Sequence, residues 1–277
     1  MISLENFRCP HCGESLALSE NQKSVVCKGT AKRHCFDLSS SGYVNLAPPS
    51  QSGSGDSKEA VRSRTDFLES GGYLPVSREI TSLVSKYCRG GLVVDAGCGE
   101  GYYTNNVAKE YGGDVVGFDL SKFGVEYAAK SAKRKQISNV FFAVSSVYTL
   151  PLADNCADGI VNIFAPCVES EYARVLKTGG VLITAEAGEN HLLGLKEAIY
   201  DNAYKNNGRE DMPTGMELVE EKDVRFNLVL DDKKLIKALF SMTPYYYRTN
   251  EADMKKLESL ERLETSVDVK IKIFCKR

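Results

Sequence analysis

The stretch that most constrains the fold is an apolar run followed by three glycines and a helix pattern. Apolar residues lead up to Asp95, and Gly97, Gly99 and Gly101 follow at alternate positions. An apolar run without polar alternation is typical of a parallel strand that is covered on both faces. Glycines directly after such a strand allow a sharp turn and a close approach of a ligand to the backbone, because they carry no Cβ. Residues 102–111 then have the spacing of an amphipathic helix.

A second predicted strand narrows the class of ligand. Residues 114–119 end in Asp119, 18 positions after Gly101, where an acid in a doubly wound sheet binds ribose hydroxyls. The glycines follow Gly-x-Gly-x-Gly and not the Gly-x-Gly-x-x-Gly of dinucleotide folds. Asp95 beside them favours a ligand with ammonium and sulfonium charges over a diphosphate. The arrangement resembles the first motif of class I S-adenosylmethionine (SAM)-dependent methyltransferases; a nicotinamide or flavin site and a turn without a ligand are the alternatives.

The rest of the pattern extends this prediction to a whole sheet. Strands and helices alternate from residue 92 to about 187, as in a parallel sheet. A helix is expected over 191–204, and residues 210–221 look irregular. Residues 224–230 and 267–273 alternate in polarity and predict the two strands that a methyltransferase sheet adds at its antiparallel edge. We therefore predict an α/β class I SAM-methyltransferase fold, Rossmann-like, with a seven-stranded, mostly parallel sheet.

Ligands bind such sheets outside the carboxyl ends of the strands. That rim gathers the glycine turn, the ends of the second and third strands, the loop 162–167 and the segment after residue 187. The cofactor contacts predicted from these motifs are Asp95, Gly97, Gly99, Gly101, Asp119, Leu120, Ser145 and Ser146.

The amino end carries side chains with the spacing of a metal site. Cys9 and Cys12 form a knuckle, Cys27 follows 15 residues later, and His34 and Cys35 compete for a fourth position. Two such half-sites suit tetrahedral zinc. Four protein ligands would make the ion structural, and it would supply on the order of 10 kcal/mol to the folding of this short segment. We predict a small N-terminal zinc ribbon.

Three parts follow from these motifs. We expect a zinc-binding ribbon at 1–40, a linker with bridging helices at 41–90, and the SAM-dependent methyltransferase domain at 91–277. The stretch 50–57 is rich in serine and glycine and reads as the flexible part of the linker. Asp56 or Ser57 would cap the first bridging helix.

Charge and hydropathy limit the partners. The net charge of -2 excludes a nucleic-acid contact made by the molecule as a whole. A local basic patch is available at 122–135, where five lysines and arginines accompany one glutamate. The run 245–248, three tyrosines and an arginine, suits base stacking and core packing equally. No apolar run is long enough to span a membrane and no signal peptide is evident, so we expect a cytoplasmic protein that is not attached to a membrane.

With these residues in hand, the chain resembles one family. It is similar to the 23S rRNA (guanine-N1)-methyltransferases of the RlmA type, which include the tylosin-resistance methyltransferases. The resemblance runs from Cys9 almost to the carboxyl end. The segments that carry it are Cys9/Cys12/Cys27, Arg33-His34, Phe36-Asp37, Gly42-Tyr43-Val44-Asn45-Leu46, Gly55-Asp56-Ser57, Arg64, Phe67-Leu68, Gly71, Tyr73, Pro75, residues 97–104, Ala165-Pro166-Cys167, His191-Leu192 and Met242-Thr243-Pro244.

The resemblance has consequences for cofactors, partners and residues. It implies that the ribbon helps to recognise an rRNA hairpin, that the enzyme forms a homodimer, and that it is linked to antibiotic resistance in some members. The implied SAM contacts are Tyr73, Gly99, Glu100 and His191, and the implied ligands of one zinc ion are Cys9, Cys12, Cys27 and His34. Two departures stand out. The spacing from Cys27 to His34 is longer than usual, which keeps Cys35 as an alternative ligand, and Ser146 stands where related enzymes carry an acid.

The implied reaction requires an accessible base and a proton acceptor, and the sequence does not assign a residue to either task. Guanine N1 lies on the base-pairing edge, so the target base must be unpaired or flipped before attack. N1 must also lose a proton, and no general base is assigned, although Asn162, Glu186 and Glu189 lie near the rim. Two other functions remain open: a SAM-dependent methyltransferase acting on a small molecule or on another RNA, and an RNA-binding module with a degenerate SAM site.

Overall fold

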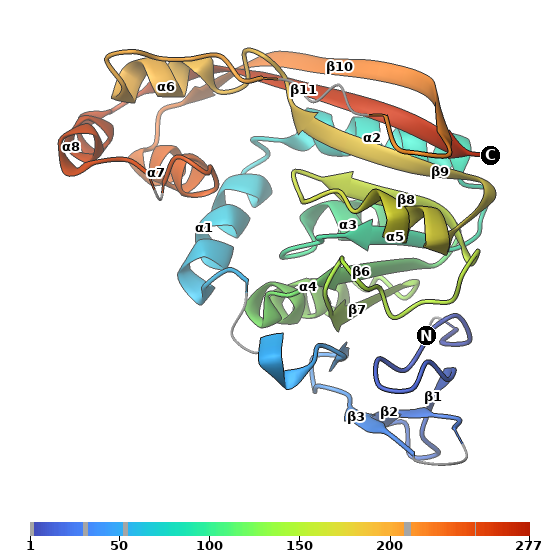
Figure 1. The fold of residues 1–277 in the computed structure, drawn as a ribbon. Coiled ribbons are helices and arrows are strands. Elements are labelled where there is room, and N and C mark those ends of the chain that lie inside the picture. Colours follow the sequence, from blue (N-terminus) through green and yellow to red (C-terminus); the bar gives the residue numbers. More distant parts are fainter. Residues whose placement is uncertain (1–2, 30–32, 52–54, 208–211, 247) are drawn as a thin grey trace.

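The computed structural model describes residues 3–29, 33–51, 55–207, 212–246 and 248–277. A large mixed sheet with helices on both faces forms the body of the molecule, and a small three-stranded sheet at the amino end lies against it (Figure 1). In the described part of the chain, no helix is both long and apolar enough to cross a membrane.

The large sheet has eight strands in the order β10-β11-β9-β8-β5-β6-β7-β4. Neighbouring strands from β9 to β4 pair in parallel, and β11 runs antiparallel to both β9 and β10. The strands are β4 (Tyr43–Asn45), β5 (Val93–Ala96), β6 (Val115–Asp119), β7 (Val140–Val144), β8 (Ala157–Ile163), β9 (Leu176–Ala187), β10 (Met216–Leu230) and β11 (Leu263–Lys276).

Helices cover the sheet because successive residues of its central strands face opposite sides. Val93 packs into the core beneath α2 and α3, whereas its neighbour Val94 packs into the core on the other face, with α5 and the amino end. Helices α1 and α6–α8 gather where the parallel strands end (Figure 1). The helices are α1 (Lys58–Glu69), α2 (Leu74–Tyr87), α3 (Tyr102–Glu110), α4 (Lys122–Arg134), α5 (Glu169–Val175), α6 (Leu193–Ile199), α7 (Lys233–Ser241) and α8 (Glu251–Ser259), with a 3-10 turn at Pro49–Gln51.

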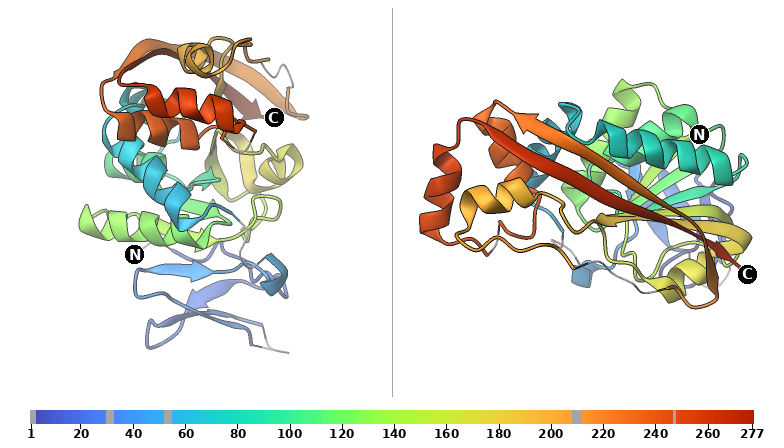
Figure 2. Two further views of the ribbon diagram at one scale, coloured as in Figure 1. Left: turned by 90° about the vertical axis from the view of Figure 1, so that its left-hand side faces the viewer. Right: turned by 90° about the horizontal axis from the view of Figure 1, so that it is seen from above.

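The amino-terminal ribbon shares its core with the large sheet. Its strands β1 (Leu16–Leu18), β2 (Ser24–Cys27) and β3 (Cys35–Asp37) form an antiparallel sheet, which lies at one end of the molecule in the left view of Figure 2 and behind the body in the right view. Phe7 is fully buried, and its ring centre lies 6.0 Å from that of Phe118 in β6 and 5.8 Å from that of Phe141 in β7. The ribbon is thus seated on the body and is not held by a tether alone.

Most expected elements are confirmed, and four expectations need correction. The sheet has eight strands instead of seven, because Tyr43–Asn45 in the predicted linker pairs with β7 and covers its edge. The helix expected over 191–204 is only Leu193–Ile199, and β10 already begins at Met216 inside the stretch that looked irregular. Helix α8 was not predicted. Residues 52–54 of the linker and Tyr247 of the aromatic run lie outside the described residues.

Candidate active site and metal centre

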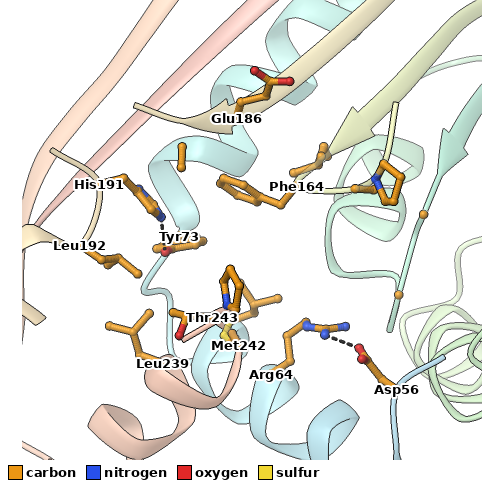
Figure 3. Close-up of a pocket in the computed structure, with 18 of the residues that line it drawn as sticks. Asp56, Arg64, Tyr73, Phe164, Glu186, His191, Leu192, Leu239, Met242 and Thr243 are labelled. Atoms are coloured by element: carbon orange, nitrogen blue, oxygen red, sulfur yellow. Dashed lines mark hydrogen bonds and ion pairs between the residues drawn. The ribbon is translucent and has the colours of Figure 1, made fainter. Parts of the chain in front are cut away.

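A cavity of about 940 Å³ opens at the carboxyl ends of the parallel strands (Figure 3). Its floor comes from the glycine turn after β5, the end of β6 and the loop after β8. Its walls come from α1, from Tyr73 just before α2, from the segments 204–207 and 242–245, and from Arg248. The position follows from topology, since parallel strands leave a crevice where their order reverses. Here the strand order reverses at β5, because β6 lies on one side of it and β8 on the other.

Buried carboxylates line the floor of this cavity. Asp95 is 4% exposed and accepts a hydrogen bond of 2.6 Å from Thr104 Oγ1. Burial, with the nearby charges of Asp119 and Glu100, raises the pKa of Asp95 to about 7 in spite of that hydrogen bond. Burial also raises the pKa values of Glu100 and Asp119. Acids held together in this way favour a cationic ligand, because a nearby positive charge offsets both their burial and their mutual repulsion.

The glycine turn and Asp119 form a single unit. Asp119 accepts hydrogen bonds from the backbone N–H of Gly99 at 2.9 Å and of Ser121 at 2.7 Å. Gly97 has a φ of +93°, and a Cβ there would lie 2.6 Å from Ala165 Cβ. Gly101 serves packing, since a Cβ at its position would lie 2.5 Å from Ala128 Cβ in α4. Gly97 therefore lets the loop after β8 approach the turn, and Gly101 lets α4 approach it.

Helix α1 contributes the only described arginine in contact with these acids. Arg64 pairs with Asp56, and its Nη1 lies 3.3 Å from Glu100 Oε2. Ser57 caps the helix by accepting a hydrogen bond from the N–H of Ala60. Asp56 and Arg64 were not among the predicted cofactor contacts, although both belong to the segments that carry the family resemblance. Glu100, which pairs with Arg64, is 36 positions further along the chain, so the pairing is not evident from the sequence.

Three aromatic rings stand opposite the acids. Tyr73 Oη lies 3.1 Å from His191 Nε2, and the ring of Phe164 lies 5.7 Å from His191 and 6.2 Å from Tyr73. Burial lowers the pKa of His191 to about 4, so the imidazole is neutral at physiological pH. Its Nδ1 accepts from the N–H of Asp268 at 3.3 Å, which places the proton on Nε2. His191 therefore donates to Tyr73 and leaves the Tyr73 hydroxyl proton for a ligand.

A buried lysine supports the far wall of the cavity. Lys196 is 1% exposed, and its Nζ donates to Tyr204 O at 2.8 Å and to Asn206 Oδ1 at 2.7 Å. The same Nζ lies 4.4 Å from the Tyr204 ring centre and 5.1 Å from that of Tyr245. Burial lowers its pKa. Lys196 thus ties together three residues that line the cavity.

The cysteine cluster forms a compact site in the ribbon. One ligand atom each from Cys9, Cys12, Cys27 and His34 lies within 4.8 Å of the others. The N–H of His34 donates to Cys27 Sγ at 3.0 Å and lowers the pKa of the Cys27 thiol, which favours the thiolate that zinc needs. Cys35 is exposed and outside the group. Three sulfurs and one imidazole are the donor set of a structural zinc site.

Comparisons with known proteins agree with both sites. A family model described as "Methyltransferase domain" matches residues 89–235, and one described as "RlmA, N-terminal" matches residues 7–54. A Bacillus subtilis protein named "Putative 23S rRNA (guanine-N(1)-)-methyltransferase YxjB" is 31% identical over 98% of each chain. The chain belongs to the RlmA family of methyltransferases. This family member therefore has the SAM-dependent methyltransferase fold and a zinc ribbon, as expected.

Two further comparisons of this RlmA-family chain concern a named relative and a solved structure. The "23S rRNA (guanine(748)-N(1))-methyltransferase" of Streptomyces fradiae is 32% identical over 83% of this chain and 81% of its own length. Among solved structures, the YcgJ protein of Bacillus subtilis superimposes with a TM-score of 0.51 at 17% identity, over 72% of this chain and 99% of the other. The second likeness concerns the fold alone.

The predicted cofactor contacts of this RlmA-family enzyme divide into two groups. Seven of them line the cavity described above: Tyr73, Asp95, Gly97, Gly99, Glu100, Asp119 and His191. Gly101 and Leu120 line no described cavity. Ser145 and Ser146 line a second cavity, of about 850 Å³, between the ribbon and the sheet, where Arg8 and His11 also lie. Contact of any of these eleven residues with the cofactor stays a prediction.

Proposed function

We propose that this enzyme methylates N1 of a guanine in a hairpin of 23S rRNA, with SAM as methyl donor. The observation that carries the proposal is one cavity with two unlike halves. Carboxylates suited to a cation line its floor, and aromatic rings suited to a base line its opposite wall. The names of the relatives at about 31% identity support guanine N1 of 23S rRNA as the acceptor.

The chain's own residues fit the cofactor. Asp119 has the position of the acid that binds ribose hydroxyls, and its two backbone hydrogen bonds hold the carboxylate in place. Asp95 and Glu100 would face the ammonium and sulfonium charges. Gly97 and Gly99 leave the space that a side chain would fill. When bound, SAM supplies an electrophilic methyl group, and the residues supply alignment, which contributes about 7 kcal/mol or more to such displacements.

The opposite wall would receive the RNA next to the acceptor base. Tyr204 and Tyr245 lie over the ammonium of Lys196 and line the cavity, and Arg248 lies at the same wall. Aromatic side chains beside an arginine are the usual means of holding an unpaired base by stacking. The ribbon, which is seated on the body through Phe7, would contact the hairpin that presents this base.

The remaining assignments belong to the same proposal. We infer a ribbon at 1–40, a bridging segment at 41–90 and a methyltransferase domain at 91–277, with the reservation that 43–45 completes the sheet of the domain. The resemblance supports a homodimer, which sedimentation equilibrium would test. A ribosomal RNA substrate supports a cytoplasmic location.

Primer extension on 23S rRNA from cells with and without the gene tests the proposal. A methyl group at N1 blocks reverse transcription, so a stop that appears only with the gene identifies the modified guanine. Purified enzyme should transfer label from SAM to a 23S fragment and not to free GTP. Transfer to GTP or to another small molecule in the absence of RNA would favour the alternative of a small-molecule methyltransferase. RNA binding without any transfer would favour a degenerate SAM site.

A further inference from the structure

The reaction proposed above leaves one chemical question open, namely which group receives the proton of guanine N1. Asn162 is unsuited to this role. It is 2% exposed, and its Nδ2 donates to Ala96 O, Pro166 O and Tyr172 Oη at 3.0–3.2 Å. Its amide has no useful basicity and holds the loop after β8 in place.

Glu189 is also unsuited. Its carboxylate is exposed and pairs with Lys205 Nζ at 2.8 Å. It does not belong to the residues that line the cavity. Glu189 therefore lies near the rim in sequence but outside the site in space.

Glu186 differs from Glu189 in its exposure, in its pairing and in its position. It lies at the end of β9, is half-buried and lines the cavity (Figure 3). Among the hydrogen bonds and ion pairs of the described residues, none involves its carboxylate. Its cross-strand neighbour Lys270 is directed to Glu221 at 2.6 Å and to Asp223 at 3.8 Å. A half-buried carboxylate in a cavity, without a partner, is available to a ligand.

Phe164 follows the end of β8, which pairs with the end of β9 that carries Glu186. Its backbone N–H donates to Ala185 O at 2.9 Å, so the backbone of Phe164 lies next to the residue that precedes Glu186. The residue has a φ of +51°, and its side chain remains 44% exposed on the cavity. A bulky residue rarely adopts this backbone conformation, and such strain is concentrated at functional sites. Figure 3 shows Phe164 and Glu186 on the same side of the cavity.

We propose that Phe164 and Glu186 form the guanine slot, in which the ring stacks on the base and the carboxylate accepts hydrogen bonds from N1–H and the N2 amino group. This inference rests on the proposed function. Among the bases, only guanine presents these two adjacent donors on its pairing edge. A carboxylate with two oxygens matches them, and a base without them leaves the carboxylate unsatisfied.

The carboxylate of Glu186 also accepts the proton that the reaction releases. N1 forms a bond to the methyl carbon while the carbon–sulfur bond breaks and leaves its electron pair on sulfur. The N1 proton passes to a Glu186 oxygen, and from there to solvent through the half-exposed side chain. Glu186 is in this account a catalytic residue, because it touches the reacting nitrogen. Its role differs from that of Tyr73 and His191, which are neutral at physiological pH.

Glu186→Gln tests the assignment, with Glu189→Gln as the matched control that removes a neighbouring carboxylate outside the cavity. Single-turnover methylation of a 23S fragment is measured, and SAM affinity is measured by calorimetry. We expect Glu186→Gln to lower the rate about 100-fold or more, as for loss of a general base. SAM affinity and melting temperature should stay at wild-type values, and Glu189→Gln should behave as wild type.

A fragment with inosine at the target position tests recognition separately, because inosine keeps N1–H and lacks the N2 amino group. The wild type should prefer guanosine about tenfold or more, and Glu186→Gln should narrow that preference, while Phe164→Ala should raise KM for both fragments. An active wild type whose Glu186→Gln variant keeps its rate within threefold would overturn the role of Glu186 and leave the proposed function standing. A wild type that does not methylate the 23S fragment would overturn the proposed function, and the guanine slot with it.

Discussion

The cysteine cluster of the ribbon and the cavity at the strand ends are built in opposite ways. The cluster draws its four ligands from one short segment, Cys9 to His34, and brings their ligand atoms within 4.8 Å of one another. The cavity draws its lining from residues as distant as Gly55 and Arg248. A tetrahedral set of four protein ligands leaves no open position for chemistry. An open cavity with charged groups on its floor remains incomplete until its ligand binds.

The difference separates contacts that stabilise the fold from groups that are arranged to bind a ligand. One ion satisfies the whole cluster, so its binding energy is folding energy. The cavity instead carries Asp56, Asp95, Glu100 and Asp119, and Arg64 pairs with only two of them, Asp56 and Glu100. This arrangement costs stability in the free enzyme and is offset when a cation arrives.

The largest expected effect separates the two regions directly. Cys27→Ser should remove the zinc and unfold the ribbon, with a loss on the order of 10 kcal/mol of metal-dependent folding energy. Cys35→Ser, which changes an exposed cysteine outside the cluster, should keep one zinc per chain. Metal analysis and limited proteolysis measure both. Loss of zinc in Cys35→Ser together with its retention in His34→Ala would assign the fourth ligand the other way.

The second prediction concerns the cost of a buried acid. The carboxyl group of Asp95 titrates near pH 7 in the native state and near 4 when unfolded, so the native state binds more protons in between. The free energy of unfolding therefore falls as pH rises from 4 to 7. Asp95→Asn should remove this fall and stabilise the ligand-free protein at pH 8 by up to roughly 4 kcal/mol.

Urea unfolding at pH 5 and pH 8 measures this effect, and Asp66→Asn, an exposed position in α1, is the control. The same ionisation should make wild-type SAM affinity rise with pH through 7, because the ionised carboxylate attracts the cation. If the free energy of unfolding depended on pH equally in Asp95→Asn and wild type, ionisation of Asp95 would not destabilise the protein. The contrast between a stabilising cluster and a destabilising cavity would then weaken.

The third prediction concerns a substitution in the carboxylate-lined floor of the cavity. Asp119→Ala loses two hydrogen bonds that its carboxylate accepts from the backbone, together with the expected contacts to ribose, and should weaken SAM binding about 100-fold or more. Zinc should stay at one per chain, since the cluster and the cavity share no residue. Calorimetry and metal analysis on the same preparation decide it. SAM affinity within threefold of wild type would move the cofactor to a different site.

The smallest expected effect is on the far wall. Lys196→Met keeps a long buried side chain but loses the bonds to Tyr204 and Asn206, and should lower kcat/KM for RNA about fivefold. The change should appear mainly in KM for RNA, with SAM affinity unchanged, and Lys237→Met on the exposed face of α7 is the control. An equal loss of SAM affinity would show that the two halves of the cavity are not independent.

Local sequence determined much of the site. The glycine turn, Asp119 and the cysteine spacing are read over short distances, because a tight turn and a metal knuckle are each made by neighbouring residues. The alternation of strands also predicted the parallel core. The same reasoning could not choose between His34 and Cys35, which are adjacent in sequence, and only the structure brings the imidazole into the cluster.

Tertiary structure decided the rest, because partners distant in sequence determine what a side chain is free to do. Tyr43–Asn45 became an eighth strand only because β7 offers an unpaired edge. Glu186 and Glu189 are three positions apart and chemically identical, yet Glu186 lines the cavity without a partner among the described residues, while Glu189 lies outside the lining and pairs with Lys205. The chain alone thus identified a methyltransferase with a metal-bound ribbon, and the fold determined which carboxylate is available for the proposed guanine.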